Sequence, residues 1–484
     1  MKPRNLLVIM SDEHSPRALG VAGHALARTP NLDRLAARGT RFTSAYTSSP
    51  ICVPARASFA TGKYQYQVGY WDNADAYDGA VPSWHHFLRA GGHRVVSIGK
   101  LHFRGLPGDD HGFSEEIVPM HVVEGLGDVK GLVRSDIPRR KGYEKLAALA
   151  GPGESPYTRY DRDIAGRAQA WLREEAPRHS DRPWALFVSF VCPHFPLVAP
   201  QRFFDLYPPE RIPLPKQYVP TERPDHPYLR EYHACVGYDD GFGGDLGKVR
   251  RAMAGYLGLV SFMDDNVGTV LRALGDSGLT AVTRIVYTSD HGDNAGARGL
   301  WGKSTMFEES AGVPLILAGP DIGAGARCGT PVSHIDLFPF FLAATGTAMP
   351  PGDYKGVSPL ELAAGAQPDR AVLSEYHAIG STGGVTMLRK GRWKYVHYVQ
   401  YRPQLFDLES DPEELVDVAD HAENAPTLAA LRAELRHFCD PAEVDARAKL
   451  RQAELLARYG GREAALARGD LNYTPAPGQP PDMN

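Results

Sequence analysis

Short apolar runs alternate with helical patterns along the first two-thirds of the chain, and this alternation limits the possible folds more than any other feature. The apolar runs have the length and composition of buried strands, and they span residues 6–10, 94–98, 184–190, 284–289 and 314–318. The helical patterns between them span residues 31–37, 83–89, 161–175, 256–274 and 336–344. Such a sequence is typical of an α/β protein. We therefore predict a large mixed, mostly parallel sheet covered by helices on both faces.

The pattern changes beyond about residue 370. Three apolar runs there look like antiparallel strands, at 385–389, 393–399 and 405–408, and helical patterns follow at 425–438 and 441–457. Since 484 residues exceed the usual size of one domain, we predict two units. A catalytic domain would span 1–370, and a small C-terminal α+β subdomain with an antiparallel sheet would span 371–484. The Pro-rich tail from Thr474 is expected to be mobile or to cross to a partner subunit.

Composition excludes several classes of protein. A net charge of −4 gives no electrostatic case for binding nucleic acid or an acidic membrane, and no apolar run approaches the roughly 18 residues that span a bilayer. The first apolar run is too short for a secretory signal and lacks a cleavage site. The five Cys are scattered and odd in number, which favours a reducing compartment. We predict a cytoplasmic protein without a nucleic-acid or membrane partner; a homo-oligomer stays open.

Polar residues follow the predicted strands directly. Asp12, Lys100, His194 and Asp290 each come just after the carboxyl end of a strand, which is the edge where open α/β sheets bind ligands. The clusters Ser11-Asp12-Glu13 and Ser289-Asp290-His291 would together supply carboxylate oxygens for a hard cation. Either cluster alone would more often be a turn or a helix cap.

The pentapeptide Cys52-Val53-Pro54-Ala55-Arg56 predicts a helix start. Pro54 suits the first turn of a helix, where its missing N–H costs nothing. Cys52 would then lie at a helix N-terminus that favours an oxyanion, and Arg56 would add a planar donor fork. Taken alone, the pattern is more often an ordinary buried Cys, so its surroundings decide its interpretation.

Together with Thr61-Gly62-Lys63, this pentapeptide resembles the signature of the type I sulfatases, in the arylsulfatase and choline-sulfatase-like branch of the alkaline phosphatase superfamily. The resemblance extends along most of the chain, through Asp12, Lys100, His102, His194, Asp290 and Lys303. It implies that a formylglycine-generating maturation enzyme oxidises Cys52 to an aldehyde whose hydrate is the nucleophile. It also implies a sulfatase, a sulfuric ester hydrolase that cleaves a small organic sulfate monoester with a divalent metal.

The resemblance places the metal on four residues: Asp12, Glu13, Asp290 and His291. Glu13 stands where the family commonly has Asp, and His291 where many members have Asn. Oxygen ligands favour Ca²⁺, although the imidazole makes Mn²⁺ or Zn²⁺ more plausible than usual.

The resemblance also implies roles for the basic residues. Lys100 would contact the sulfate oxygens and His102 the hydrate hydroxyl, while Arg56 and Lys303 would help to neutralise the anion. His194 is preferred as general acid for the leaving alcohol, with Lys303 as an electrostatic clamp.

Three further residues are candidates for substrate binding: Asn73, and also Tyr376 and His377, whose segment resembles one near the substrate in choline-sulfatase-like members. Aromatic rings beside acidic residues would suit a quaternary ammonium group, although aromatic residues are usually part of the core.

Three alternatives stay open. The same fold and nucleophile serve phosphonate monoester and phosphodiester hydrolases, with which His291 is compatible. An anion-binding protein would keep Cys52 unoxidised. A Cys–His thiol hydrolase fits less well, because its chemistry needs no metal carboxylates.

Overall fold

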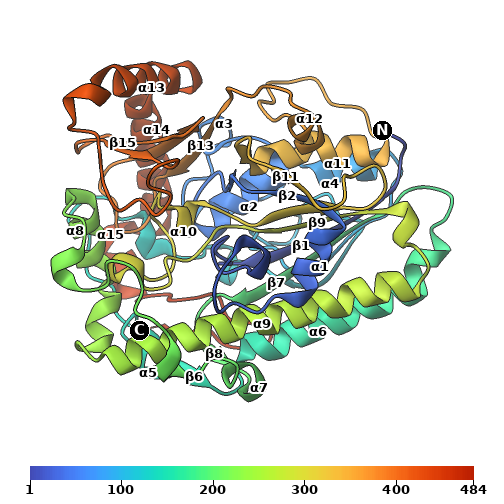
Figure 1. Ribbon diagram of the computed structural model, residues 1–484, viewed down its shortest axis with the longest axis horizontal. Coiled ribbons are helices and arrows are strands. Elements are labelled where there is room, and N and C mark those ends of the chain that lie inside the picture. The colour runs from blue at the N-terminus through green and yellow to red at the C-terminus, as the bar shows by residue number, and fades with distance from the viewer. Residues whose placement is uncertain (484) are drawn as a thin grey trace.

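Eight strands form one large sheet at the centre of the protein, whose computed structural model describes residues 1–483 (Figure 1). Their order is β11 (Ala326–Cys328), β2 (Gly39–Phe42), β10 (Leu315–Ala318), β9 (Thr283–Ser289), β1 (Asn5–Asp12), β7 (Ala185–Pro193), β4 (Val95–Lys100) and β5 (Glu115–Met120). The five strands from β9 to β5 are parallel, whereas β10 is antiparallel to both of its neighbours. The predicted mixed, mostly parallel sheet is confirmed.

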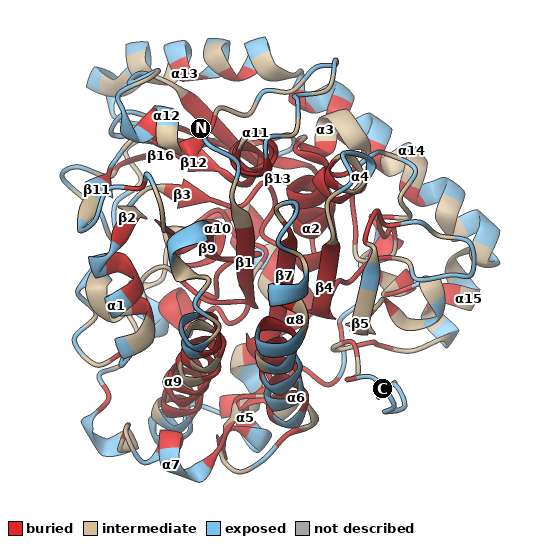
Figure 2. Cartoon of the chain, turned by 90° about the vertical axis from the view of Figure 1, so that its right-hand side faces the viewer, coloured by how far each residue is buried: buried red, intermediate tan, exposed pale blue. Residues whose placement is uncertain are grey.

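The central strand β1 shows why both faces of the sheet are covered. Leu7 and Ile9 belong to one hydrophobic cluster, whereas Leu6, Val8 and Met10 belong to another on the opposite face. Since both sets of side chains are fully buried, the strand is apolar throughout, as expected of a parallel strand between two helical layers. Figure 2 shows this buried centre formed by β1, β7 and β4.

Helices pack on both faces. On one side α6 (Pro156–Ala170) and α9 (Leu246–Asp276) lie next to each other against β7, and α1 (Pro30–Ala37) packs on α9 (Figure 1). On the other side α2 (Cys52–Thr61), α4 (Trp84–Ala90) and α11 (Leu337–Thr345) share the second hydrophobic cluster. Shorter helices occupy the connections: α3 (Gln65–Val68), α5 (Lys145–Leu149), α7 (Gln201–Phe204), α8 (Pro227–Val236), α10 (Glu308–Ala311) and α12 (Pro359–Ala363). Within residues 1–483 no helix has both the length and the apolar character needed to cross a membrane.

Helix α9 and strand β5 show how the structure differs from the sequence prediction. Helix α9 begins well before residue 256, because the carboxylate of Asp245 caps it by accepting from the backbone N–H groups of Gly247 and Lys248. Residues 115–120, where no strand was predicted, form the edge strand β5. Its two Glu residues and Pro119 hide it from a search for buried strands, and Pro is tolerated there because β5 pairs only with β4.

The C-terminal part contains the expected antiparallel sheet. Its strands are β13 (Ala371–Tyr376), β14 (Val385–Lys390), β15 (Trp393–Tyr398) and β16 (Gln404–Asp407), followed by α13 (Ala425–Phe438), α14 (Pro441–Tyr459) and α15 (Gly461–Ala467). The first of these strands was not predicted. A domain boundary at residue 370 stays a prediction.

The tail turns back onto its own chain after α15. Asp470 accepts an ion pair from Lys130 at 2.7 Å, and the carbonyl of Thr474 accepts a hydrogen bond from the Tyr157 hydroxyl at 2.5 Å. The expectation of a mobile tail is therefore wrong for these residues, whereas crossing to a partner subunit stays a prediction.

Candidate active site

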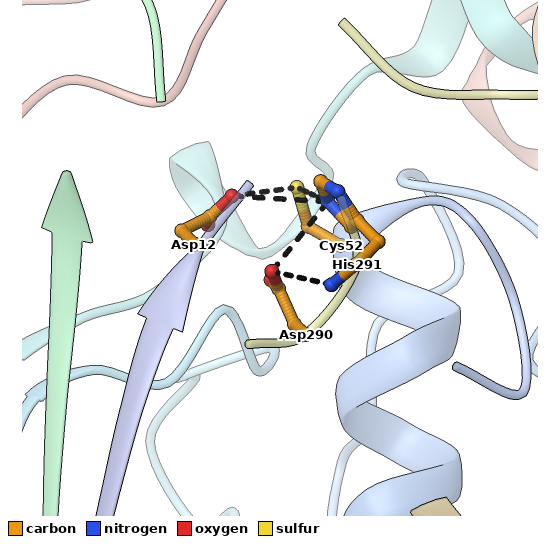
Figure 3. Close-up of side chains that lie close together, drawn as sticks. All are labelled: Asp12, Cys52, Asp290 and His291. Atoms are coloured by element: carbon orange, nitrogen blue, oxygen red, sulfur yellow. Dashed lines mark hydrogen bonds and ion pairs between the residues drawn. The ribbon is translucent and has the colours of Figure 1, made fainter. Parts of the chain in front are cut away.

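The end of β1, the end of β9 and the start of α2 meet at the carboxyl edge of the sheet. Because β1 and β9 are paired in register through Ser11 and Ser289, the following residues, Asp12 and Asp290, lie at the same level. Figure 3 shows both carboxylates facing Cys52, the first residue of α2, and His291. Candidate ligand atoms of these four residues lie within 4.8 Å of one another.

The side chains of this group form a buried polar centre. The Cys52 sulfur lies 3.1 Å from Nε2 of His291 and 3.8 Å from Oδ1 of Asp12. The same imidazole nitrogen is 3.7 Å from Oδ1 of Asp12 and 3.7 Å from Oδ1 of Asp290. His291 Nδ1 donates to the carbonyl of Gly292 at 3.0 Å, so Nε2 presents its lone pair to the group, as in a metal-binding histidine.

Glu13 gives the strongest indication of a cation. Its backbone is left-handed, with φ 69°, a conformation that a non-glycine residue rarely adopts and that marks functional sites. Both carboxylate oxygens are buried and lack a hydrogen-bond partner within residues 1–483; Lys303 and His194 approach only to 3.4 Å. Burial raises the pKa of Glu13 well above its usual value. A divalent cation would satisfy these oxygens. Glu13 groups with Asp12 and His194, whereas Asp12 also groups with Asp290 and His291, so a metal site at Asp12 fits these residues and the predicted set of four ligands stays a prediction.

Arg56 contacts the carboxylates of Asp12 and Asp290. Its Nε donates to Asp290 at 2.8 Å, and its NH2 group lies 3.4 Å from Asp12. The NH1 group donates to the Lys100 carbonyl and to the Ser189 hydroxyl. The guanidinium is therefore occupied by protein groups, and it holds the two carboxylates rather than facing an anion as the sequence suggested.

Lys100 forms a buried ion pair with Asp12. Burial raises the pKa of the Asp12 carboxyl, but the charges of Lys100 and of other basic groups outweigh burial, and the net pKa lies well below the usual range. Asp12 is thus ionised at neutral pH.

His194 and Lys303 form a direct pair: Nζ of Lys303 donates to Nε2 of His194 at 2.8 Å. Nδ1 of His194 donates to the carbonyl of Phe195 at 2.7 Å, so the imidazole is neutral with both nitrogens occupied. Burial, with the charge of Lys303, lowers the pKa of His194 well below its usual value. Asp293 fixes the loop before Lys303 by accepting from the backbone N–H of Gly302 at 2.9 Å.

His102 contacts a residue that the sequence did not indicate. Its Nε2 lies 2.6 Å from the hydroxyl of Thr474 in the tail. Burial lowers the pKa of His102 well below its usual value, and Lys100 adds to the effect. No local pattern around Thr474 marks it as functional, because only the folded tail brings it to the site.

A cavity of about 60 Å³ lies above Cys52. Asn73, Lys100, His102, His194 and Lys303 line it, together with the aromatic residues Tyr143, Phe195, Tyr232, Tyr238 and Tyr473. The tail closes one side through residues 471–474.

Asn73 also braces the helix start, since its Oδ1 accepts from the backbone N–H of Val53 at 3.1 Å. The structure does not bring Tyr376 and His377 to this cavity. The Tyr376 hydroxyl donates to the Ile379 carbonyl, and the His377 ring packs edge-on against Trp71. Both side chains are buried in packing outside the cavity lining.

The environment of Cys52 argues against a thiol nucleophile. The residue is 1 % exposed, and burial, with the charge of Asp12, raises the pKa of the thiol to about 11. Reactive cysteines need the opposite shift. The neighbouring His291 imidazole therefore does not make a working Cys–His pair.

Together, the sheet and the polar centre define a hydrolase of the alkaline phosphatase-like fold, with acidic and basic groups around a helix-start cysteine. A sequence model of the sulfatase family matches residues 4–347, and this chain belongs to that family. A second model, of the C-terminal region of N-sulphoglucosamine sulphohydrolase, matches residues 296–440. The prediction of a sulfatase, a hydrolase of sulfate esters, is confirmed.

This chain is also similar to individual sulfatases and related hydrolases. The chain is 34 % identical to a choline-sulfatase of Rhizobium meliloti (strain 1021), over 89 % of this chain and 85 % of the relative. Among solved structures, a phosphonate monoester hydrolase of Agrobacterium radiobacter superposes with a TM-score of 0.73 at 23 % identity, over 99 % of both chains. A 2-O GAG sulfatase superposes with a TM-score of 0.72 at 22 % identity, over 90 % of this chain and 92 % of the other. Both of these structures share the fold of this chain.

Proposed function

We propose that this sulfatase cleaves a small organic sulfate monoester in the cytoplasm, with formylglycine at position 52 as nucleophile and Ca²⁺ on Asp12, Glu13, Asp290 and His291. The convergence of Cys52 with two strand-end carboxylates and an imidazole supports this proposal most directly. The thiol is buried and hard to ionise, so conversion by a maturation enzyme would give position 52 a function that the thiol lacks.

The metal, when bound, would offset the negative charge of the ester and favour ionisation of a hydroxyl at position 52. Lys100 and Lys303, which both line the cavity, would supply further positive charge. Arg56 would keep Asp12 and Asp290 in place through its hydrogen bonds.

The proton for the leaving alcohol is assigned to the pair of Lys303 and His194. Since Lys303 donates to His194 Nε2, the proton between them resides on Lys303 in the resting site. The geometry favours Lys303 as the donor and His194 as the group that orients it, the reverse of the order suggested by the sequence.

The leaving group is proposed to be small. The cavity is lined by aromatic rings and is closed on one side by residues 471–474. Such rings suit an aryl ring or, by cation–π contact, a quaternary ammonium group. The choline-sulfatase relative makes choline sulfate a candidate. Comparing kcat/KM for choline sulfate and nitrophenyl sulfate would separate these two types of alcohol.

Two measurements test the proposal. Peptide mass spectrometry across residue 52, on protein produced with a maturation enzyme, should find an aldehyde, and sulfate release should scale with the converted fraction. An intact thiol at position 52 in fully active protein would refute formylglycine as the nucleophile.

A phosphonate monoester or phosphodiester hydrolase is the second candidate, because the Agrobacterium radiobacter enzyme superposes along the whole chain. Converted protein should prefer aryl sulfate to phenylphosphonate monoester in kcat/KM. A large preference for the phosphonate would favour the second candidate.

A further inference from the structure

Three metal-ligating side chains gather at the outer edge of the sheet, outside the cavity above Cys52. His111 Nδ1 lies 2.9 Å from Oε1 of Glu116, and His121 Nε2 lies 3.3 Å from Oε2 of the same carboxylate. One candidate ligand atom from each residue lies within 4.8 Å of the other two. Glu116 belongs to β5, and the two histidines flank that strand.

An irregularity in β5 creates this arrangement. Glu116 and His121 would point to opposite faces of a regular strand, because they are separated by an odd number of residues. Between the pairs Ile98–Ile117 and Lys100–Met120 the register shifts, so that β5 has one extra residue. This bulge turns both side chains to one face.

The backbone is strained at the bulge. Val118 has φ 43°, which is unfavourable for a β-branched residue. Its carbonyl accepts a hydrogen bond from the Tyr160 hydroxyl at 2.5 Å. Strain of this kind persists where the surrounding structure holds it, and it marks functional positions.

The neighbouring loop is fitted to the two imidazoles. Gly105 passes so close to His121 that a Cβ atom there would lie 2.3 Å from the ring, and its φ of 67° also favours glycine. His85 Nδ1 contacts the carbonyl of His111 at 2.9 Å. The loop at Gly105 thus packs directly on the His121 ring, and His85 fixes the backbone of His111.

We propose that His111, Glu116 and His121 bind a divalent transition metal ion, with Zn²⁺ best suited to the donor set. Two imidazoles and one carboxylate are typical zinc ligands, and with bonds of about 2.0–2.1 Å the ligand atoms of a tetrahedral site are about 3.3 Å apart. The imidazoles lie 2.9 and 3.3 Å from different oxygens of the Glu116 carboxylate, and one ligand atom from each of the three residues lies within 4.8 Å of the other two, so small side-chain shifts would bring them to that spacing. The Glu116 and His121 side chains are 23 % and 21 % exposed, so water can reach a fourth position.

The ion would brace the active site indirectly. The segment from His102 to Val122 is closed by backbone hydrogen bonds from His102 to Met120 and from Val122 to Phe103. His102 and Val122 both line the cavity above Cys52. A metal bound within this segment would therefore restrain the loop that carries His102.

Metal counting on chelator-treated protein, reloaded with Zn²⁺ alone and desalted, tests the site. The variant Asp290→Asn weakens the centre at Cys52 and isolates the second site. We expect Asp290→Asn/His121→Gln and Asp290→Asn/Glu116→Gln each to retain one zinc ion per chain fewer than Asp290→Asn. Adding His421→Gln, at a half-exposed histidine elsewhere, should change nothing. Equal zinc content in all four proteins would show that the cluster is only a hydrogen-bonded His–Glu–His group.

A second measurement needs no variant. Diethyl pyrocarbonate modifies accessible histidines, and His121 is partly exposed. Zinc should protect His121 in the wild-type protein, as read by peptide mass spectrometry, while His421 is modified equally with and without the ion. Equal modification of His121 in both samples would overturn the proposal.

Discussion

Nζ of Lys303 lies 2.8 Å from Nε2 of His194 and donates a hydrogen bond to it. Because Nδ1 of that imidazole donates to the Phe195 carbonyl, His194 has no proton on Nε2 to give to a leaving alcohol. The pair therefore carries its transferable proton on Lys303. Loss of Lys303 should therefore affect most strongly those substrates whose leaving group needs a proton.

Replacing Lys303 by Ala should slow cleavage of alkyl sulfates by roughly 10²–10⁴-fold, the usual contribution of a general acid. Nitrophenyl sulfate should be less affected, because nitrophenolate leaves without protonation. His194→Gln should show a weaker form of the same selectivity. A plot of log kcat against leaving-group pKa measures it, and equal losses for both substrate types would remove the assignment of Lys303.

The variant Cys52→Ala should lose sulfate release by at least roughly 10⁴-fold, since it removes the nucleophile. Its melting temperature should change little, because the substitution lies in the first turn of α2. Cys328→Ala, at a buried cysteine on the edge strand β11, is the matched control and should keep its activity. Residual activity in Cys52→Ala close to that of the control would contradict the proposed chemistry.

Arg56→Lys should weaken metal binding, on the order of 10–100-fold in Kd, because residues that orient ligands have effects of this size. A lysine cannot bridge Asp12 and Asp290 as the guanidinium does. Calorimetric titration of chelator-treated protein with Ca²⁺ measures the change. The control is Arg284→Lys, at a buried arginine that contacts Ala344 and Asp321 instead. If Arg56→Lys raised KM and left the Kd for Ca²⁺ unaltered, Arg56 would have to face the substrate.

The metal-free protein should become less stable as the pH rises. Burial raises the pKa of Glu13 well above 4.5, so between these two values the folded state holds a proton that the unfolded chain has released. The free energy of unfolding then falls with increasing pH. Added Ca²⁺ should reverse the trend, because it binds the ionised carboxylate.

Melting temperatures from about pH 5 to 8, with and without chelator, measure this effect. Other buried carboxyls titrate in the same range, so the informative comparison is with Glu13→Gln. That variant should show a flatter pH dependence and a smaller response to Ca²⁺. Parallel curves for the two proteins would exclude Glu13 as the source.

Thr474→Val should lower kcat/KM by about tenfold, since a lost hydrogen bond to His102 Nε2 is worth about 1 kcal/mol or somewhat more. Thr474→Ser keeps the hydroxyl and should recover most of the activity. Steady-state kinetics on one substrate compares the two. Similar losses in both variants would point to packing of the tail and not to the hydrogen bond.

Sequence patterns predicted the strand-end positions of Asp12 and Asp290 and the helix start at Cys52. These positions follow from runs of neighbouring residues, since apolar strands and a proline in a first turn are local preferences. The same local patterns did not predict β5, because an edge strand that contains Pro119 and two glutamates lacks the apolar run of a buried strand.

Local sequence patterns could not predict which distant residues contact each other. The guanidinium of Arg56 could bind either an anionic ligand or the carboxylates of the protein, because both accept its hydrogen bonds. Only the packed sheet brings Asp290, 234 positions away in the chain, into contact with it. Thr474 and His102 are 372 positions apart, and the bulge at Val118 depends on how β5 pairs with β4. Local propensity is encoded in adjacent residues, whereas contacts between distant residues are selected by the free energy of packing the whole chain.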